Sequence, residues 1–156
     1  IPEMRKELSH KYYLFGISMT IVIADQVSKH FLLNSLAEGI DYNFIPYLIQ
    51  LKLVRNYGAA FSLFNNHSEF LGIISFIVSI FLILLIFQKA TVSILENLWI
   101  SFLLAGSIGN GIDRWQYGYV VDFIKLIPVN FPIFNIADIS INIAVILLAR
   151  NYLKSR

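Results

Sequence analysis

The chain has 156 residues, a length typical of one domain. Hydrophobic residues make up 57% of it and charged residues 14%, against roughly 45–50% and 25% in soluble domains, and the mean hydropathy is +0.68. This composition argues against an ordinary soluble domain and a disordered chain. The net charge of +2 is too small to indicate nucleic-acid binding, and the lack of cysteine excludes disulfides, thiolate catalysis and cysteine-ligated metals.

Four apolar stretches predict four membrane-spanning helices, because a spanning helix needs about 20 mostly apolar residues. We place these helices at approximately residues 12–33, 70–88, 97–113 and 133–152. Phe70–Phe87 contains no charge, whereas the other three reach spanning length only with polar ends near the interface. After Ala24 the first stretch continues into Asp25-Gln-Val-Ser-Lys29 and not into a small-residue site, which argues against signal-peptide cleavage.

The segments between the helices, residues 34–69 and 114–132, are expected to lie outside the membrane. Apolar and polar residues partly alternate within 44–64, which predicts a β-strand or hairpin there. In the third helix, Ala105-x-x-x-Gly109 and Ser107-x-x-x-Gly111 favour close helix packing. We therefore predict an all-α membrane protein of one domain, with four transmembrane helices and a small extracytoplasmic β-rich region.

Basic residues favour an orientation with both termini in the cytoplasm. The cytoplasmic side would then hold seven basic residues and the outer side four. In this orientation the polar residues of the first, third and fourth helices all fall at the outer membrane face. The residues that gather there are Asp25, Lys29, Asn56, Asn110, Asp113, Arg114, Asp122, Asn135 and Asp138.

Two carboxylates are the strongest candidates for chemistry. Asp138 lies in an apolar helix three residues after Asn135, and an ionisable residue there costs roughly 2.5–3.5 kcal/mol on insertion scales. Asp122 lies within the apolar run Val120–Ile124, where loss of water should raise its pKa. Two adjacent carboxylates share a proton, so that one accepts a proton from water while the other donates, as in aspartic proteases.

Two other charged pairs allow both a structural and a functional interpretation. Asp25 and Lys29 are four residues apart on one helix face, and we favour a structural ion pair. Asp113 and Arg114 form either a ligand clamp or a structural pair, and we favour the structural one because arginine commonly snorkels at an interface. The histidines have no metal-ligand spacing, so no metal site is expected.

The sequence resembles the lipoprotein signal peptidases (signal peptidase II), in five motifs that occur in order across nearly the whole chain. One departure is Ile139, where the family often has a small polar residue after the aspartate. The motifs are Asp25-Gln-Val-Ser-Lys29, Arg55-Asn-Tyr-Gly-Ala-Ala-Phe61, Gly109-Asn-Gly-Ile-Asp-Arg114, Val120-Val-Asp-Phe-Ile124 and Phe134-Asn-Ile-Ala-Asp138.

The resemblance implies an aspartic endopeptidase of the bacterial inner membrane. Its substrates would be diacylglyceryl-modified prolipoproteins, cleaved just before the lipidated cysteine, with Asp122 and Asp138 as the catalytic pair. The resemblance also implies a monomer in contact with membrane lipid, no metal or organic cofactor, and inhibition by the cyclic peptide globomycin. The residues expected to line or support the site are Asp25, Lys29, Asn56, Gly58, Ala59, Asn110, Asp113, Arg114 and Asn135.

Two other functions fit a small membrane protein with intramembrane carboxylates. A proton-coupled carrier would use Asp25, Asp122 and Asp138 as relay groups. Against it, polar residues gather at one face, whereas a pathway needs them through the full depth. A non-catalytic membrane subunit would bind partners through its small-residue faces. Ion flux in proteoliposomes would reveal the carrier, and a stable partner without hydrolysis would favour the subunit.

Overall fold

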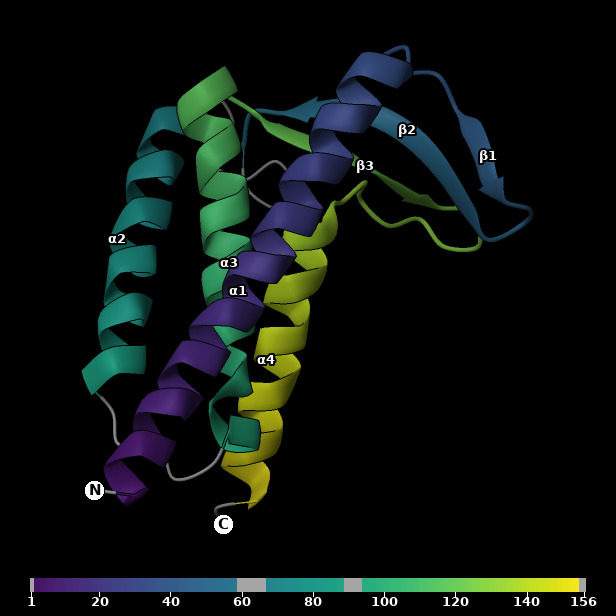
Figure 1. Cartoon of the computed structure of the whole chain (residues 1–156). Helices are drawn as coiled ribbons and strands as arrows, with labels where there is room; N and C mark the ends of the chain where they lie inside the picture. Colours follow the sequence, from purple (N-terminus) through teal and green to yellow (C-terminus); the bar gives the residue numbers. More distant parts are fainter. Residues whose placement is uncertain (1, 59–66, 89–93, 155–156) are drawn as a thin grey trace.

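The computed structural model describes residues 2–58, 67–88 and 94–154, which form four helices and a three-stranded sheet (Figure 1). The sheet lies at one end of the helix bundle, and both ends of the chain lie at the other (Figure 1). The helices are α1 (Pro2–Ser35), α2 (Ser68–Gln88), α3 (Ile94–Tyr117) and α4 (Ile136–Lys154). The strands are β1 (Tyr42–Ile45), β2 (Ile49–Asn56) and β3 (Val120–Leu126).

The helix ends differ from those expected, because apolar content marks only the hydrophobic part of a helix and not its polar first and last turns. α1 begins at Pro2 and not near residue 12, and α3 continues to Tyr117. α4 begins at Ile136 and not at residue 133, since Asn135 caps it. Among the described residues, α2 and α4 are long and apolar enough to qualify as membrane spans. The four-span arrangement therefore stays a prediction for α1 and α3.

α3 packs against each of the other three helices, and its glycines allow the closest contacts. A Cβ atom on Gly106 would lie 2.6 Å from the Ala137 carbonyl oxygen, and one on Gly109 would lie 2.7 Å from a carboxylate oxygen of Asp25. A Cβ on Gly111 would meet the side chain of Ser75 in α2 at 3.1 Å. The close helix packing predicted for Gly109 and Gly111 is confirmed.

The interior of the bundle changes character along its length. A buried apolar cluster fills the half nearer the chain ends. It comprises Leu14, Leu82, Ile86, Ile100 and Leu104. Towards the sheet the buried side chains include charged ones, among them Asp25, Lys29 and Asp113. The buried charged groups therefore meet where the helices join the sheet.

The strands form one antiparallel sheet in the order β1-β2-β3. The strand or hairpin predicted within 44–64 is confirmed up to residue 56, with β1 beginning two residues earlier, whereas residues 59–64 lie outside the described residues. β3 was not predicted, since its apolar run, broken by Asp122, does not alternate. Gly118, with φ of 75°, ends α3 by donating its N–H to the Arg114 carbonyl and turns the chain into β3.

Candidate active site

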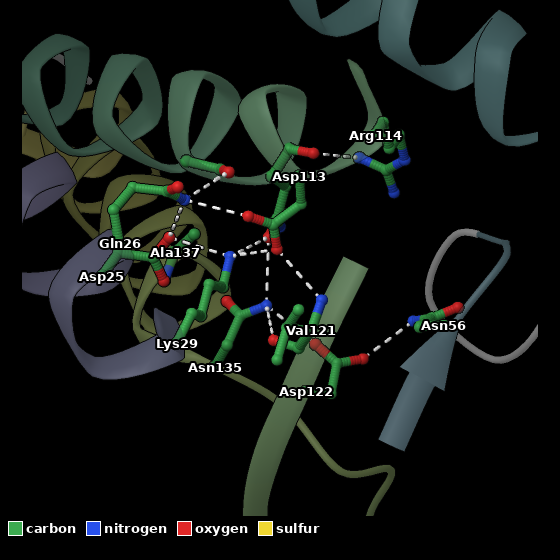
Figure 2. A network of polar contacts seen from close by, with 12 residues as sticks. Asp25, Gln26, Lys29, Asn56, Asp113, Arg114, Val121, Asp122, Asn135 and Ala137 are labelled. Carbon is green, nitrogen blue, oxygen red and sulfur yellow. Dashed lines mark hydrogen bonds and ion pairs between the residues drawn. The ribbon is translucent and has the colours of Figure 1, made fainter. Parts of the chain in front are cut away.

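Strand pairing places Asp122 against β2. Asp122 lies opposite Val54, and its side chain is only 2% exposed. Asn56 is two residues beyond Val54 and so points to the same face of the sheet. Its amide nitrogen donates to Asp122 Oδ2 at 2.9 Å, while its oxygen accepts the N–H of Gly58 at 3.0 Å (Figure 2). The asparagine thus connects the carboxylate to the chain beyond β2.

Asp138 is held by the start of α4. The Asn135 side chain accepts the N–H of Asp138 at 2.8 Å, and Asp138 Oδ2 accepts the N–H of Asn135 at 3.2 Å. This reciprocal pair is a capping box, which stabilises the first turn of the helix. Just before it, Phe134 exchanges backbone hydrogen bonds with Ile124 of β3, at 2.8 and 3.1 Å. The carboxylate in the first turn of α4 is thereby placed beside the strand that carries Asp122.

Two asparagine amides connect these two carboxylates. Asn135 Nδ2 donates to Asp122 Oδ1 at 2.7 Å (Figure 2), and Asn110 Nδ2 donates to Asp138 Oδ1 at 2.8 Å. Asn135 Nδ2 also lies 3.0 Å from Asn110 Oδ1. A continuous path of carboxylate, amide, amide and carboxylate therefore joins β3, the start of α4 and α3.

Burial changes the acidity of Asp122. Loss of water and then the neighbouring Asp138 raise the pKa of Asp122 to about 7, against the opposing hydrogen bonds of Asn56 and Asn135 and the charge of Lys29. This confirms the raised pKa expected from its apolar sequence context. A pKa near the operating pH suits a group that takes part in general acid–base catalysis.

A cavity of about 990 Å³ opens onto both carboxylates. Its polar side includes Asn56, Asn110 and Arg114. Its apolar wall comes from three helices, with Ile74 and Val78 on α2, Leu103 on α3 and Ile141 on α4. A mostly apolar cavity with a few convergent polar groups is typical of a ligand or active site.

A buried ion triad lies behind the cavity. Lys29 Nζ lies 2.8 Å from Asp25 Oδ2 and 2.9 Å from Asp113 Oδ2, and all three side chains are at most 2% exposed (Figure 2). The predicted Asp25–Lys29 ion pair is thus confirmed and extended by a third member. Lys29 also donates to Asn110 Oδ1 at 3.2 Å, which connects the triad to the asparagine that contacts Asp138.

The predicted pairing of Asp113 with Arg114 is wrong. Asp113 points towards Lys29, while Arg114 donates to the carbonyl of Gly58 at 3.1 Å and to that of Asn110 at 3.4 Å. Adjacent residues on a helix point about 100° apart, so one residue reaches the interior triad and the other the cavity. The Arg114 Nε atom is buried without a partner among the described residues.

Comparison with known proteins shows which family the chain is similar to. The family described as signal peptidase (SPase) II matches residues 17–154. The lipoprotein signal peptidase of Synechococcus sp. (strain RCC307) is 42% identical over 147 residues, covering 94% of this chain and 97% of the relative. That of Enterococcus faecalis (strain ATCC 700802 / V583) is 42% identical over 132 residues, covering 85% and 82%.

The chain belongs to the signal peptidase II family. A solved structure described as a bacterial membrane enzyme matches with a TM-score of 0.85 at 38% identity, covering 91% of this chain and 88% of that one. The chain is accordingly a peptidase with the fold of a bacterial membrane enzyme.

Most residues selected from the motifs of this family meet in the structure. Ala59 lies outside the described residues, whereas the other ten surround the cavity or the triad behind it. Sequence reasoning missed Gln26, whose amide nitrogen lies 3.2 Å from Asp25 Oδ2, 2.9 Å from Asp113 Oδ1 and 3.1 Å from the Gly109 carbonyl (Figure 2). Gln26 could have been selected from the sequence, because it is a neutral polar residue directly after Asp25 in a mostly apolar stretch.

Proposed function

We propose that Asp122 and Asp138 are the catalytic dyad of an aspartic endopeptidase that cleaves diacylglyceryl-modified prolipoproteins directly before the lipidated cysteine. Membership of the signal peptidase II family assigns the chain the removal of signal peptides from prolipoproteins. The observation that carries the dyad is geometric. Two carboxylates from β3 and α4 line one cavity and are joined through the amides of Asn135 and Asn110.

The chemistry needs one protonated and one ionised carboxylate. With its pKa near 7, Asp122 is the proton donor and Asp138 the base. Asp138 takes a proton from water, whose oxygen bonds to the scissile carbonyl carbon, while Asp122 protonates the carbonyl oxygen. The C–N bond of the tetrahedral intermediate then breaks, and the cysteine nitrogen takes up a proton from the dyad. The products are the free signal peptide and a lipoprotein with an N-terminal cysteine.

The cavity walls suit a lipidated substrate. Ile74, Val78, Leu103 and Ile141 offer an apolar surface for acyl chains beside the dyad. Lipid chains anchored there would hold the scissile bond near the carboxylates and lower the entropic barrier to reaction. Arg114, whose guanidinium reaches the Gly58 carbonyl, is placed to position the substrate backbone.

We further propose four membrane spans, cytoplasmic termini and an extracytoplasmic active site in the bacterial inner membrane. The dyad end of the bundle lies opposite the chain ends (Figure 1). Arg5, Lys6, Arg150 and Lys154 belong to the end that holds the termini, in line with the excess of basic residues on the cytoplasmic side. We expect the enzyme to act as a monomer and to be inhibited by globomycin.

The test is a gel-shift cleavage assay with the purified full chain in detergent and a diacylglyceryl-modified prolipoprotein. We expect cleavage before the modified cysteine, and its loss in Asp122→Asn and in Asp138→Asn, with both variants folded. Asp41→Asn is the matched control, because Asp41 is an exposed carboxylate bound to Lys52 and Lys125 on the sheet. Substantial turnover by either dyad variant would contradict the proposal.

A further inference from the structure

Two backbone amides beside the dyad donate to carboxylates of the ion triad. The N–H of Val121 donates to Asp113 Oδ2 at 3.0 Å, and the N–H of Ala137 donates to Asp25 Oδ1 at 2.9 Å (Figure 2). Each amide belongs to the residue immediately before a dyad aspartate. Asp113 thus holds β3 directly beside Asp122, and Asp25 holds the first turn of α4 directly beside Asp138.

Lys29 joins these two carboxylates. Its ammonium contacts Asp25 at 2.8 Å and Asp113 at 2.9 Å. Lys29 therefore bridges the carboxylate bound to α4 and the carboxylate bound to β3. The three side chains are 0–2% exposed, and water does not screen them. Hydrogen bonds to charged partners are shorter and roughly twice as strong as neutral ones. The path from one dyad aspartate to the other through α1 therefore consists of strong, directional contacts.

We propose that Lys29 is a positioning residue that sets the separation and orientation of the two dyad carboxylates by holding Asp25 and Asp113 together. This role rests on the dyad proposed above. This role goes beyond a structural ion pair, because Asp113 and Asp25 accept hydrogen bonds from the backbone amides directly before the two dyad aspartates. A misplacement of about 1 Å at a catalytic site can cost roughly 100-fold in rate. The proposal therefore predicts a loss of turnover larger than any loss of substrate binding.

The experiment compares kcat and KM of Lys29→Met with those of Lys11→Met. Lys11 is the matched control, since it lies on the same helix and also pairs with the acidic residue four positions earlier, Glu7 at 2.9 Å. It donates to the carbonyl of Phe87 in the last turn of α2 at 3.0 Å, and not to a residue of the site. We expect kcat of Lys29→Met to fall by roughly 10- to 100-fold with KM changed by less than about threefold. Lys11→Met should keep the wild-type kcat.

The pH profile and rescue by arginine provide two further readouts: the first reports the charge of Lys29 near Asp122, and the second tests whether a cation must bridge the two carboxylates. Charged groups near Asp122 are Asp138 on α4, Asp113 and Arg114 on α3, and Lys29 and Asp25 on α1. Removing the ammonium removes a positive charge that lowers the pKa of Asp122. The alkaline limb of the kcat profile should therefore move to higher pH in Lys29→Met. Lys29→Arg retains the charge and can bridge two carboxylates, so it should recover part of kcat.

The outcomes separate the two proposals. Turnover by Asp122→Asn would overturn the dyad itself. An inactive Asp122→Asn together with a folded Lys29→Met of wild-type kcat would overturn only the positioning role. If Lys29→Met does not fold, Asp25→Asn and Asp113→Asn test the positioning role instead. Each removes the charge of one carboxylate that binds Lys29 and a backbone amide beside the dyad. Lower kcat in both supports the role, and wild-type kcat in both overturns it.

Discussion

Replacing Asp122 with asparagine separates the proposed catalytic role of this carboxylate from its effect on the fold. The side chain is 2% exposed, and burial raises its pKa to about 7, from an ordinary value of 3.8. The folded protein therefore binds the proton more tightly than the unfolded chain. Stability falls as the pH rises from about 3.8 to about 7 and levels off above that. An asparagine of the same shape has no such dependence.

The two pKa values give the size of the effect. A difference of about 3 between folded and unfolded pKa corresponds to about 4 kcal/mol of stability lost by pH 8. The asparagine introduced in Asp122→Asn would offer one oxygen to two donors, Asn56 and Asn135, and an unpaired donor costs about 1–3 kcal/mol. We therefore expect Asp122→Asn to be less stable than the wild type by about 1–3 kcal/mol near pH 4, and more stable by about 1–3 kcal/mol near pH 8.

Thermal unfolding in detergent between pH 4 and pH 9 measures this difference. The two tryptophans, Trp99 and Trp115, both lie on α3 and report unfolding by fluorescence. The Tm curves of the wild type and Asp122→Asn should cross between pH 4 and pH 8, while cleavage by the variant is absent throughout. Asp41→Asn, which changes an exposed carboxylate, should show no such crossing. Parallel Tm curves for the wild type and Asp122→Asn would refute the reasoning that Asp122 is buried with a strongly raised pKa.

Three further predictions concern the same site. Cleavage by the wild type should decrease as the pH rises through about 7, because Asp122 then loses the proton it donates; a rate still rising at pH 9 would contradict this assignment. Asn135→Ala should lose the cap of α4 and the link to Asp122, with a loss of about 1–2 kcal/mol in unfolding free energy and most of the activity. Gly109→Ala should displace Asp25 and lower both Tm and cleavage, since its Cβ would lie 2.7 Å from that carboxylate. Gly16→Ala, which meets nothing within 4 Å, is the control and should leave cleavage unchanged; equal activity in the two glycine variants would count against the close contact.

Local patterns predicted the parts of the site that depend on spacing along one element. Asp25 and Lys29 were expected to pair because residues four apart on a helix are neighbours, and they do at 2.8 Å. Apolar context predicted the raised pKa of Asp122, since burial acts on a carboxylate whatever its partners. Adjacency in sequence did not predict contact between side chains: Asp113 pairs with Lys29, whereas Arg114 donates to the carbonyl of Gly58.

The sequence by itself therefore determined the helical membrane-enzyme class, the family and the polar residues that carry its motifs. The tertiary structure decided which of these residues touch. β3 pairs with β2, Asn110 reaches Asp138, and Asp113 joins Lys29 from a distant part of the chain. Such contacts depend on how α3 packs against α1 and α4 at Gly109, and helix packing acts through space and not along the chain. Apolar context and the family motifs could name Asp122 and Asp138 as the proposed dyad, but the packing of α1, α3, β3 and α4 was needed to bring them to one cavity.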